Sequence, residues 1–521
     1  NHTKGIKMQK SPSIQQLVEH VRIHQEMGKY DTLLPVINTL LKKDPNNSEY
    51  LLWKLQVLDA QQEEILDFNL LHHYVNMRSS DVTGYLLLYK AYMSKNMVAD
   101  ALIALAYALS VEPDDEECQY LFNKTLADIN PKYTRLKLNI LTTNRIGHLA
   151  IEIEPWLRDQ ENKVSDDNCL YLFISSGKPP ANTALYNLLK NYVHIIESSI
   201  WFNFYITRAQ LLDEQFFIQF SYDIHSILRG NTNEEIAANG SQALIRIYND
   251  HPSVLQLAPD DITQGWSLLS QYGLSKSDKI VCLHVRDSDY LNKLSSDTDF
   301  SYHNYRDVNI AHYQKAVESL IDKGYKVVRI GNGSNQKLNI LSENYLDFCL
   351  DRDKEHGDFF ELLLISQCSF YIGALSGPIS VVALFDTPTL CVNSVPFNPP
   401  YLRSCRFIPK HLFHNNEKVN VIDVYEGKVL SEQDDTPLLF CSDGNKLSKY
   451  GYHYIENTAE EILLAVNEFE KQIVDGEFLN EVTPLQKKYT ERIQNLPTDF
   501  IFKDSSSLVC DSFLSQYPEL F

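Results

Sequence analysis

A chain of 521 residues, of which 44% are hydrophobic and 22% charged, has the composition of a globular protein with room for two or three domains. The formal net charge of -21, with no block rich in Lys or Arg, excludes nucleic-acid binding as a function class. No apolar run is long enough for a membrane span and no signal peptide is recognised, so we expect no transmembrane segment. Nine cysteines without a C-x-x-C pair predict free thiols in a cytoplasmic protein, with attachment at the inner face of the membrane as a variant.

Residues 11–130 show an almost purely helical pattern that repeats along the chain. The turns at Gly28–Tyr30 and Pro45–Asn47 recur at Asn96–Val98 and Pro113–Asp115, 68 residues further on in each case. This offset is twice the ~34-residue period of the tetratricopeptide helix–turn–helix repeat, which the segment resembles. We expect either a groove that docks a protein partner or a packing appendage that stiffens the domain behind it.

Strand-like and helical stretches begin to alternate near Pro131. Leu136–Leu141 is typical of a strand, the polar turn Thr142–His148 follows it, and Cys169–Ser175 is typical of a second strand. This alternation predicts a first Rossmann-like domain over residues 131–275.

A second Rossmann-like domain is predicted over residues 276–455, because short apolar strands alternate there with helices. Such spacing implies a parallel, doubly wound sheet. The remaining residues, 456–521, are expected to form C-terminal helices and a tail that packs back on the body. The strands expected in the second domain are Ile280–Leu283, Tyr325–Ile330, Tyr345–Cys349, Cys368–Ile372 and Thr389–Val392, with helices at Asn309–Lys323 and Asp358–Ser366.

Two strand ends of the second domain carry turns that suit an anion. Arg286 follows the first strand, and the turn with Ser376, Gly377 and Pro378 follows a later one. Ligands of open α/β sheets bind at the carboxyl ends of strands, and a helix that starts there offers free N–H groups. The two turns together predict a clamp for a diphosphate.

The alternative for Arg286 is a plain salt bridge to Asp287 or Asp289 on a surface loop. Several enzyme classes are disfavoured, because the chain lacks the G-x-G-x-x-G of dinucleotide-binding domains, the P-loop, the G-x-S-x-G elbow and the H-E-x-x-H metal motif. What remains is an arginine-and-hydroxyl clamp without a metal motif, which suits a nucleoside-diphosphate leaving group neutralised by side chains.

Two motifs resemble known glycosyltransferases. His284–Tyr290 is similar to the H-x-R-x-x-D-Y motif of α1,6- and α1,2-fucosyltransferases, in which the arginine binds the β-phosphate of the donor. Ile372–Pro378 resembles the I-G-x-x-S-G-P turn of bacterial GT-B glycosyltransferases, including heptosyltransferases. Asp287 departs from the first pattern, since many fucosyltransferases have a second basic residue there, so guanosine-diphosphate-fucose is left open as the donor.

A third motif, Arg145–Ala150, is similar to a family of bacterial glycosyltransferases of surface-polysaccharide gene clusters. The resemblance covers about Tyr133 to Val474 and implies a GT-B fold, with an acceptor domain first and a donor domain second. The layout of repeats before a GT-B unit also resembles O-GlcNAc transferase. The further matching stretches are Tyr305–Asp307, Asp358–Leu362 and Asn457–Glu461.

The resemblance implies a set of donor-binding residues. Arg286 would neutralise the leaving diphosphate, and Asp289 would orient Arg286 or a neighbouring loop. Glu361 would bind ribose hydroxyls, although a solvated helix face is its alternative. The implied donor set is Arg286, Asp289, Gly331, Asn332, Glu361, Ser376, Gly377 and Pro378, with Gly331 and Asn332 at the base pocket.

On the acceptor side, the resemblance implies that Arg145, Gly147 and Arg306 face the cleft. His148 is the candidate general base toward the acceptor hydroxyl, because imidazole titrates near neutral pH. Its alternative is a structural cap on the loop. The catalytic residues are thus predicted to be Arg286 and His148.

We therefore expect an α/β protein of GT-B type that moves a sugar from a nucleotide-sugar donor to a glycan or protein acceptor, without a metal or other cofactor. The helical repeats would add a protein partner. The rival hypothesis is a non-catalytic scaffold, in which the repeats bind a partner and the α/β half is degenerate.

Overall fold

The computed structural model describes residues 12–61, 67–161, 168–218, 234–286, 301–396, 399–429, 443–476, 482–496 and 501–521. By their internal packing the residues form two compact units. The first unit comprises residues 1–140, 166–177 and 193–218, and the second comprises residues 141–165, 178–192 and 219–521.

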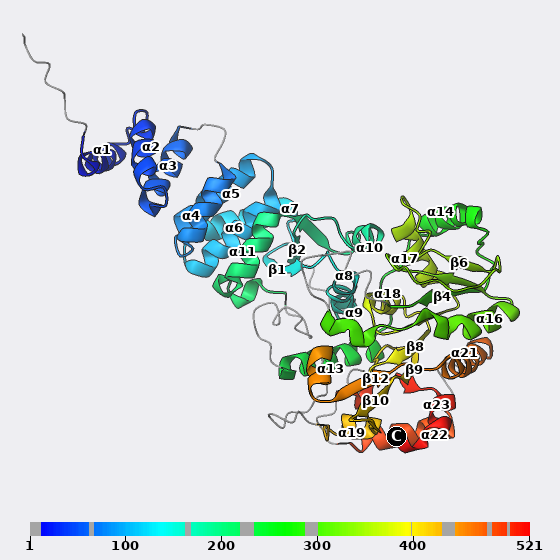
Figure 1. Cartoon of the computed structure of the whole chain (residues 1–521). Coiled ribbons are helices and arrows are strands. Elements are labelled where there is room, and N and C mark those ends of the chain that lie inside the picture. Colours follow the sequence, from blue (N-terminus) through cyan, green and yellow to red (C-terminus); the bar gives the residue numbers. More distant parts are fainter. Residues whose placement is uncertain are drawn as a thin grey trace, which may run out of the picture. The chain divides into compact units, whose positions relative to one another are not determined.

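The described part of the first unit begins with three consecutive helix pairs, α1–α2, α3–α4 and α5–α6, followed by the single helix α7 (Figure 1, blue to cyan). The first helices of the pairs start at Ile14, Ser48 and Val82 and α7 starts at Glu116, so successive starts are 34 residues apart. The predicted all-helical segment and its period are therefore confirmed. The helices are α1 Ile14–Glu26, α2 Leu33–Lys43, α3 Ser48–Ala60, α4 Phe68–Met77, α5 Val82–Ser94, α6 Val98–Val111 and α7 Glu116–Ile129.

The repeat also fixes how these helices begin. Ser13, Asn47, Asp81 and Asp115 occupy the N-cap positions of α1, α3, α5 and α7, and each side chain accepts a hydrogen bond from a backbone N–H of the first turn. Such caps satisfy donors that have no partner inside the helix and each contributes on the order of 1 kcal/mol.

The first unit continues with a three-stranded sheet in the order β1–β2–β3, followed by the helix α11. Helices α3–α7 share one hydrophobic core with this sheet and with α11, and Trp201 of α11 is fully buried in that core. This shared core supports the packing role proposed for the repeats, and a docking role stays a prediction. The bounds are β1 Arg135–Leu141, β2 Cys169–Ser175, β3 His194–Glu197 and α11 Ser199–Arg208.

The second unit is built on a seven-stranded sheet in the order β13–β9–β8–β7–β4–β5–β6, in which every neighbouring pair is parallel. The apolar residues of its central strands are buried on both faces, as parallel sheets require. The strands are β4 Ile280–His284, β5 Lys326–Arg329, β6 Tyr345–Asp347, β7 Phe370–Gly373, β8 Thr389–Ser394, β9 Cys405–Pro409 and β13 Leu508–Val509.

The chain enters this sheet at β4, builds outward through β5 and β6, and then returns to the other side of β4 with β7, β8 and β9. This is the doubly wound order of nucleotide-binding sheets, in which ligands bind where the direction reverses. That point lies between β4 and β7. Right-handed crossovers place the helices before and after the reversal on opposite faces: α16 Gln314–Asp322 on one, and α18 Gly377–Ala383 on the other.

The second unit also contains a small antiparallel sheet, ordered β11–β10–β12, and helices before and after the main sheet. The remaining elements of the second unit are α8 Ile146–Ile151, α9 Glu154–Glu161, α10 Thr183–Leu189, α13 Glu234–Asp250, α14 Pro259–Leu269, α17 Gly357–Gln367, β10 His411–His414, β11 Glu417–Lys418, α19 Val421–Tyr425, α20 Gly444–Lys449, β12 Tyr452–Ile455, α21 Ala459–Val474, α22 Pro484–Gln494 and α23 Asp511–Gln516, with 3-10 turns at Ser270–Tyr272, Ser301–Arg306, Ile310–Tyr313, Ile501–Asp504 and Pro518–Leu520. The first unit has two further 3-10 turns, Ala209–Leu211 and Glu214–Phe216.

The predicted α/β class with parallel sheets is confirmed, and the expected strands of the second half are present with limits shifted by a few residues. The predicted tail packs back on the body, since β13 pairs with β9. The domain limits at residues 130, 275 and 455 stay predictions. In the part of the chain that the structure describes, no helix has both the length and the apolar character needed to cross a bilayer.

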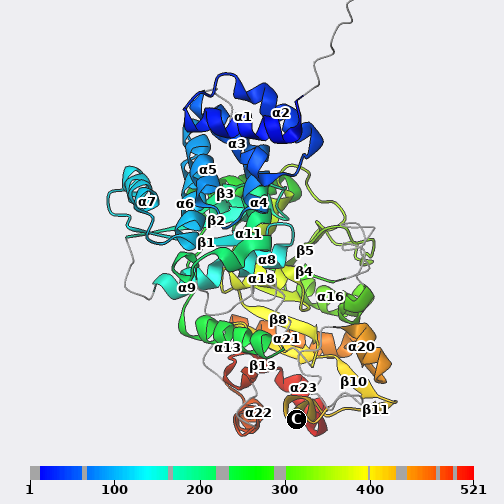
Figure 2. The same cartoon turned by 90° about the vertical axis from the view of Figure 1, so that its left-hand side faces the viewer.

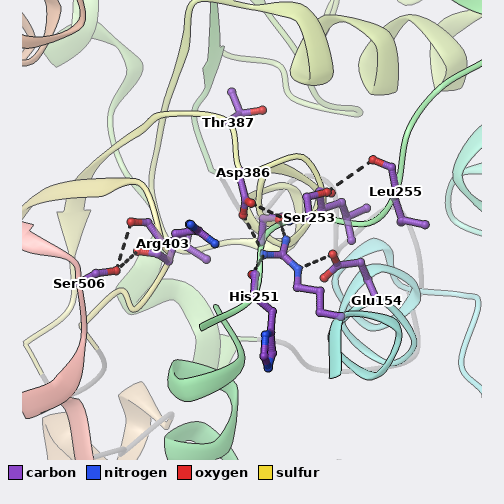
Figure 3. Close-up of polar contacts among 12 residues, drawn as sticks. Glu154, His251, Ser253, Leu255, Asp386, Thr387, Arg403 and Ser506 are labelled. Atoms are coloured by element: carbon purple, nitrogen blue, oxygen red, sulfur yellow. Dashed lines mark hydrogen bonds and ion pairs between the residues drawn. The ribbon is translucent and has the colours of Figure 1, made fainter. Parts of the chain in front are cut away.

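A buried ion cluster joins α9 to the turn after α18 within the second unit. The Arg158 guanidinium, which is fully buried, donates from Nε to Glu154 at 2.5 Å and from Nη1 to Asp386 at 2.8 Å. It also donates to the backbone carbonyls of His251 and Ala383. Figure 3 shows Glu154, His251 and Asp386 around these contacts. Burial raises the pKa of Glu154 to about 7, against the pull of the guanidinium.

We expect Arg158→Met to lower the free energy of unfolding by about 3–5 kcal/mol, because it leaves the buried Glu154 carboxylate and the partly buried Asp386 carboxylate without their cation. Lys315→Met is the matched control, since the Lys315–Glu460 pair is exposed and should contribute less than about 1 kcal/mol. Urea titrations followed by far-UV circular dichroism compare the two. Equal losses would show that the buried cluster does not stabilise the fold.

Candidate functional site

The site begins at the carboxyl ends of β4 and β7, where the sheet reverses direction. His284 ends β4 and pairs in register with Gly373 of β7. The Ser376 hydroxyl lies 3.2 Å from His284 Nδ1 and 3.2 Å from the Ala374 carbonyl oxygen, so it does not cap α18. The two turns predicted to act together are therefore joined directly by this contact.

His284 is a neutral side chain in this setting. Burial lowers its pKa to about 3, and the nearby positive charges of Arg329 and Arg286 add to the effect. Gly331, at the end of β5, has φ of 123° and would place a Cβ atom 3.1 Å from His284 Cδ2. Glycine is thus required there by both backbone conformation and space.

Helices α8 and α18 start side by side, as both views show (Figure 1 and Figure 2). A Cβ atom at Gly147 would lie 3.4 Å from Gly377 Cα, and a Cβ atom at Gly377 would lie 2.7 Å from Ile146 Cγ2. The two glycines permit the backbones to approach where any larger residue at Gly377 would force them apart. This contact brings the predicted acceptor turn onto the predicted phosphate turn.

A cleft of about 380 Å³ opens at this contact. Five residues predicted for the donor or acceptor side line it together: Gly147, His148, Arg306, Ser376 and Gly377. The rest of the wall is mostly apolar, from Leu375, Ile151, Tyr248, Ile379, Ala383, Pro400, Tyr401 and Leu402, with Ser380 among them. The sequence prediction that these turns face one cleft agrees with this arrangement, and the chemical roles stay predictions.

His148 is oriented by a carboxylate one helical turn away. Its Nδ1 lies 3.1 Å from Glu152 Oε1, while Glu152 Oε2 accepts the backbone N–H of Thr142 at 2.7 Å. Glu152 is 1% exposed, whereas the His148 side chain is 38% exposed. A carboxylate at Nδ1 leaves Nε2 as the proton-accepting nitrogen, which is the arrangement of an oriented general base.

Arg286 follows β4 and its side chain is only 13% exposed. Its Nε lies 3.4 Å from Asp307 Oδ1, but neither Nε nor Nη2 has a hydrogen-bond partner among the described residues. Burial lowers the pKa of Arg286, and the Arg306 charge adds to this effect. The guanidinium is largely buried, and the carboxylate beside it in the described part of the chain is that of Asp307. The alternative of a salt bridge to Asp287 or Asp289 is not tested, because both residues lie outside the described ranges.

Arg306 lines the cleft and precedes Asp307, the residue that pairs with Arg286. Its Nε donates to the Tyr305 hydroxyl at 2.9 Å, and its guanidinium lies 5.2 Å from the centre of that ring. Lys410 holds the 305–307 segment in place, since its Nζ donates to the carbonyls of Tyr305 and Asp307. Three cations therefore gather near the carboxylates of Asp307 and Glu456, and the excess of positive charge among these described residues favours an anionic ligand.

Glu361 and Gly331 are joined through Arg352 rather than exposed to the cleft. Arg352 Nη1 donates to Glu361 at 3.0 Å and to the Gly331 carbonyl at 3.2 Å, and Nη2 donates to Asp358 at 2.7 Å. Glu361 is 5% exposed, so the solvated-helix alternative is wrong. Burial raises the pKa of Glu361, and the Arg352 charge opposes that shift. Its ribose-binding role stays a prediction.

The remaining predicted residues lie around this centre. Asn332 is exposed beside Gly331, Arg145 is exposed at the N-cap position of α8, and Pro378 is in the first turn of α18. Asp289 lies outside the described residues.

Two residues of the site were missed by the sequence analysis. Glu152 had a usable signal, since a glutamate four positions after His148 falls on the same helix face. Lys410 had none, because its neighbours in space are about a hundred residues away in the chain.

No family model matches the chain, and no curated protein matches its sequence. Solved structures that it resembles include the ADP-heptose lipopolysaccharide heptosyltransferase II of E. coli, 14% identical, with a TM-score of 0.38 over 66% of this chain and 100% of that chain. A glycosyl transferase of family 9 from Veillonella parvula is 14% identical, with a TM-score of 0.35 over 64% of this chain and 99% of that chain.

The match with an O-GlcNAc transferase from Thermobaculum terrenum extends over 94% of this chain and 97% of that chain, with 13% identity and a TM-score of 0.24. All three are glycosyltransferases. At such low TM-scores and identities, none of these likenesses establishes the activity of this chain.

We expect Gly377→Ala to lower the free energy of unfolding by about 1–3 kcal/mol, because its Cβ atom would overlap Ile146. Gly147→Ala is the matched control, since its Cβ atom would meet Gly377 Cα at 3.4 Å, an ordinary contact. Thermal and urea unfolding of both variants measure the difference. If Gly377→Ala is as stable as Gly147→Ala, the close approach of α8 and α18 is not a constraint.

Proposed function

We propose that this protein is a glycosyltransferase that takes a sugar from a nucleoside-diphosphate-sugar donor and passes it to a hydroxyl of a glycan or protein acceptor. Cationic side chains, rather than a metal ion, would neutralise the leaving diphosphate. The helical repeats would stiffen the catalytic part and could offer a surface to a protein partner.

The observation that supports this proposal most is the buried Arg286 guanidinium at the reversal point of a doubly wound sheet. Two of its nitrogens have no hydrogen-bond partner in the described part of the chain, and leaving such donors buried costs free energy unless a ligand accepts from them. A diphosphate would supply acceptor oxygens for the Arg286 donors and negative charge to balance Arg286 and Arg306. The Ser376 hydroxyl and the Gly377 amide would complete the donor side.

The reaction breaks the bond between the sugar's anomeric carbon and the diphosphate oxygen, and forms a bond from that carbon to the acceptor oxygen. The electron pair of the broken bond leaves with the nucleoside diphosphate, which Arg286 stabilises. The proton of the acceptor hydroxyl passes to Nε2 of His148, which Glu152 orients through Nδ1. The apolar wall of the cleft would limit access of water, which would otherwise hydrolyse the donor.

We expect one nucleoside diphosphate from a panel of ADP, GDP, UDP and CDP to bind in calorimetric titrations, and Arg286→Met to weaken that binding by roughly 10- to 150-fold. This range corresponds to about 1.5–3 kcal/mol for a charged hydrogen bond. Arg246→Met is the matched control, because Arg246 is exposed on α13. If no nucleotide or nucleotide sugar binds the wild-type protein, the transferase proposal fails and the scaffold hypothesis takes its place.

His148 and Glu152 give a separate prediction. With the donor identified by that panel, His148→Gln should lower kcat for sugar transfer by ~100-fold or more, since it removes the proton acceptor, while the nucleotide Kd stays near the wild-type value. Glu152→Gln should lower kcat as well by losing the tautomer that frees Nε2. Unchanged kcat in His148→Gln would assign His148 to a structural role.

A further inference from the structure

Lys410 stands where the chain leaves the parallel sheet for the antiparallel one, between β9 and β10. It is 3% exposed, and its backbone N–H donates to the Ser394 carbonyl at 2.7 Å. Its Nζ donates to the carbonyl oxygens of Tyr305 at 3.0 Å and Asp307 at 2.7 Å. A buried ammonium thus ties the 305–307 segment to the sheet.

That segment carries the residues that face the proposed diphosphate. Arg306 lines the cleft, the Asp307 carboxylate lies 3.4 Å from Arg286 Nε, and the next N–H, of Val308, donates to the Arg286 carbonyl at 3.1 Å. Loss of the two Lys410 hydrogen bonds would therefore release Arg306 and Asp307 together.

Opposing electrostatic effects act on the pKa of Lys410. Burial lowers its pKa to about 8, and repulsion from Arg286 adds to the shift, while Glu456 and Asp307 oppose it. Glu456 reaches this region from the turn before α21 and also pairs with His312 at 3.2 Å. Arg306 adds a further positive charge from the segment that Lys410 holds, and it also lowers the pKa of Arg286.

We infer that Lys410 is a positioning residue of the donor site that takes up a proton when the nucleoside diphosphate binds. This inference rests on the proposed function. The arriving negative charge offsets the repulsion from Arg286 and favours the protonated ammonium. By linkage, a donor site that gains a proton on binding loses affinity as pH rises above the free-state pKa of Lys410. A lysine with a purely structural role would show no such coupling.

The test is calorimetric titration of the full chain with the nucleoside diphosphate selected from the panel, at pH 8.5 in two buffers of different ionisation enthalpy. The terminal phosphate and the histidines are already deprotonated at that pH. A rise of the Lys410 pKa toward its usual range on binding would take up about 0.7 proton per ligand, and would make Kd roughly eightfold weaker at pH 9.0 than at pH 7.5.

Lys410→Arg should abolish the proton uptake and flatten the pH dependence, because arginine stays protonated throughout this range. Lys410→Met should also lack proton uptake and should bind less tightly than wild type at pH 7.5, since the 305–307 segment is no longer held. Lys315→Met, a change at an exposed lysine, should keep the wild-type uptake.

Three outcomes overturn the inference. Wild-type binding without proton uptake overturns it and leaves the proposed function standing, and so does uptake that persists in Lys410→Arg. Absence of nucleotide binding by the wild-type protein overturns the proposed function and this inference with it. The arginine variant keeps the test decisive even if Lys410→Met does not fold.

Discussion

The approach of the Gly147 and Gly377 backbones is the constraint on which the rest of the site depends. It lets α8 and α18 start at one place, so a turn from early in the chain meets a turn more than two hundred residues later. Without it, His148 and Ser376 would not line the same cleft. The buried Arg158 cluster lies at the C-terminal end of α18 and fixes α9, the helix that follows α8, against it. The glycine contact permits the short distance between α8 and α18, and the Arg158 cluster holds α9 and the end of α18 together.

The buried arginines of the second unit show two different uses of the same side chain. Arg158, Arg329 and Arg352 each have a carboxylate within hydrogen-bond distance, so their charges are balanced inside the protein. Among the described residues, Arg286 has Asp307 as its carboxylate, at 3.4 Å, and a second cation, Arg306, lies close enough to lower its pKa. A buried charge of the first kind supports the fold, whereas under the proposed function the charge of Arg286 would be stabilised by the diphosphate of the donor.

The two turns of this site could be predicted from the sequence because each is marked by residues next to one another in the chain. An apolar strand followed by polar residues marks the end of β4, and glycine with proline marks the start of α18, so Arg286, Ser376 and Gly377 could be placed at these positions from the sequence. The parallel sheet then places those ends together by geometry alone. Lys410 could not be found this way, because its role comes from carbonyls of Tyr305 and Asp307, and any residue type offers a carbonyl. Strand β13 was also missed, because it has only two residues and so shows no alternating pattern in the sequence.

The chain passes between the two compact units several times, for example between Ile140 and Leu141, Gly177 and Lys178, and Tyr192 and Val193. Strands β1–β3 share their core with the helical repeats, while the turn after β1 belongs to the other unit. A unit assembled from interleaved stretches is not released by a single protease cut, nor can one continuous gene segment carry it into another protein. Removing the repeats would expose the apolar surface that β1, β2 and α11 bury against α3–α7, so we expect the rest of the chain to lose stability without them.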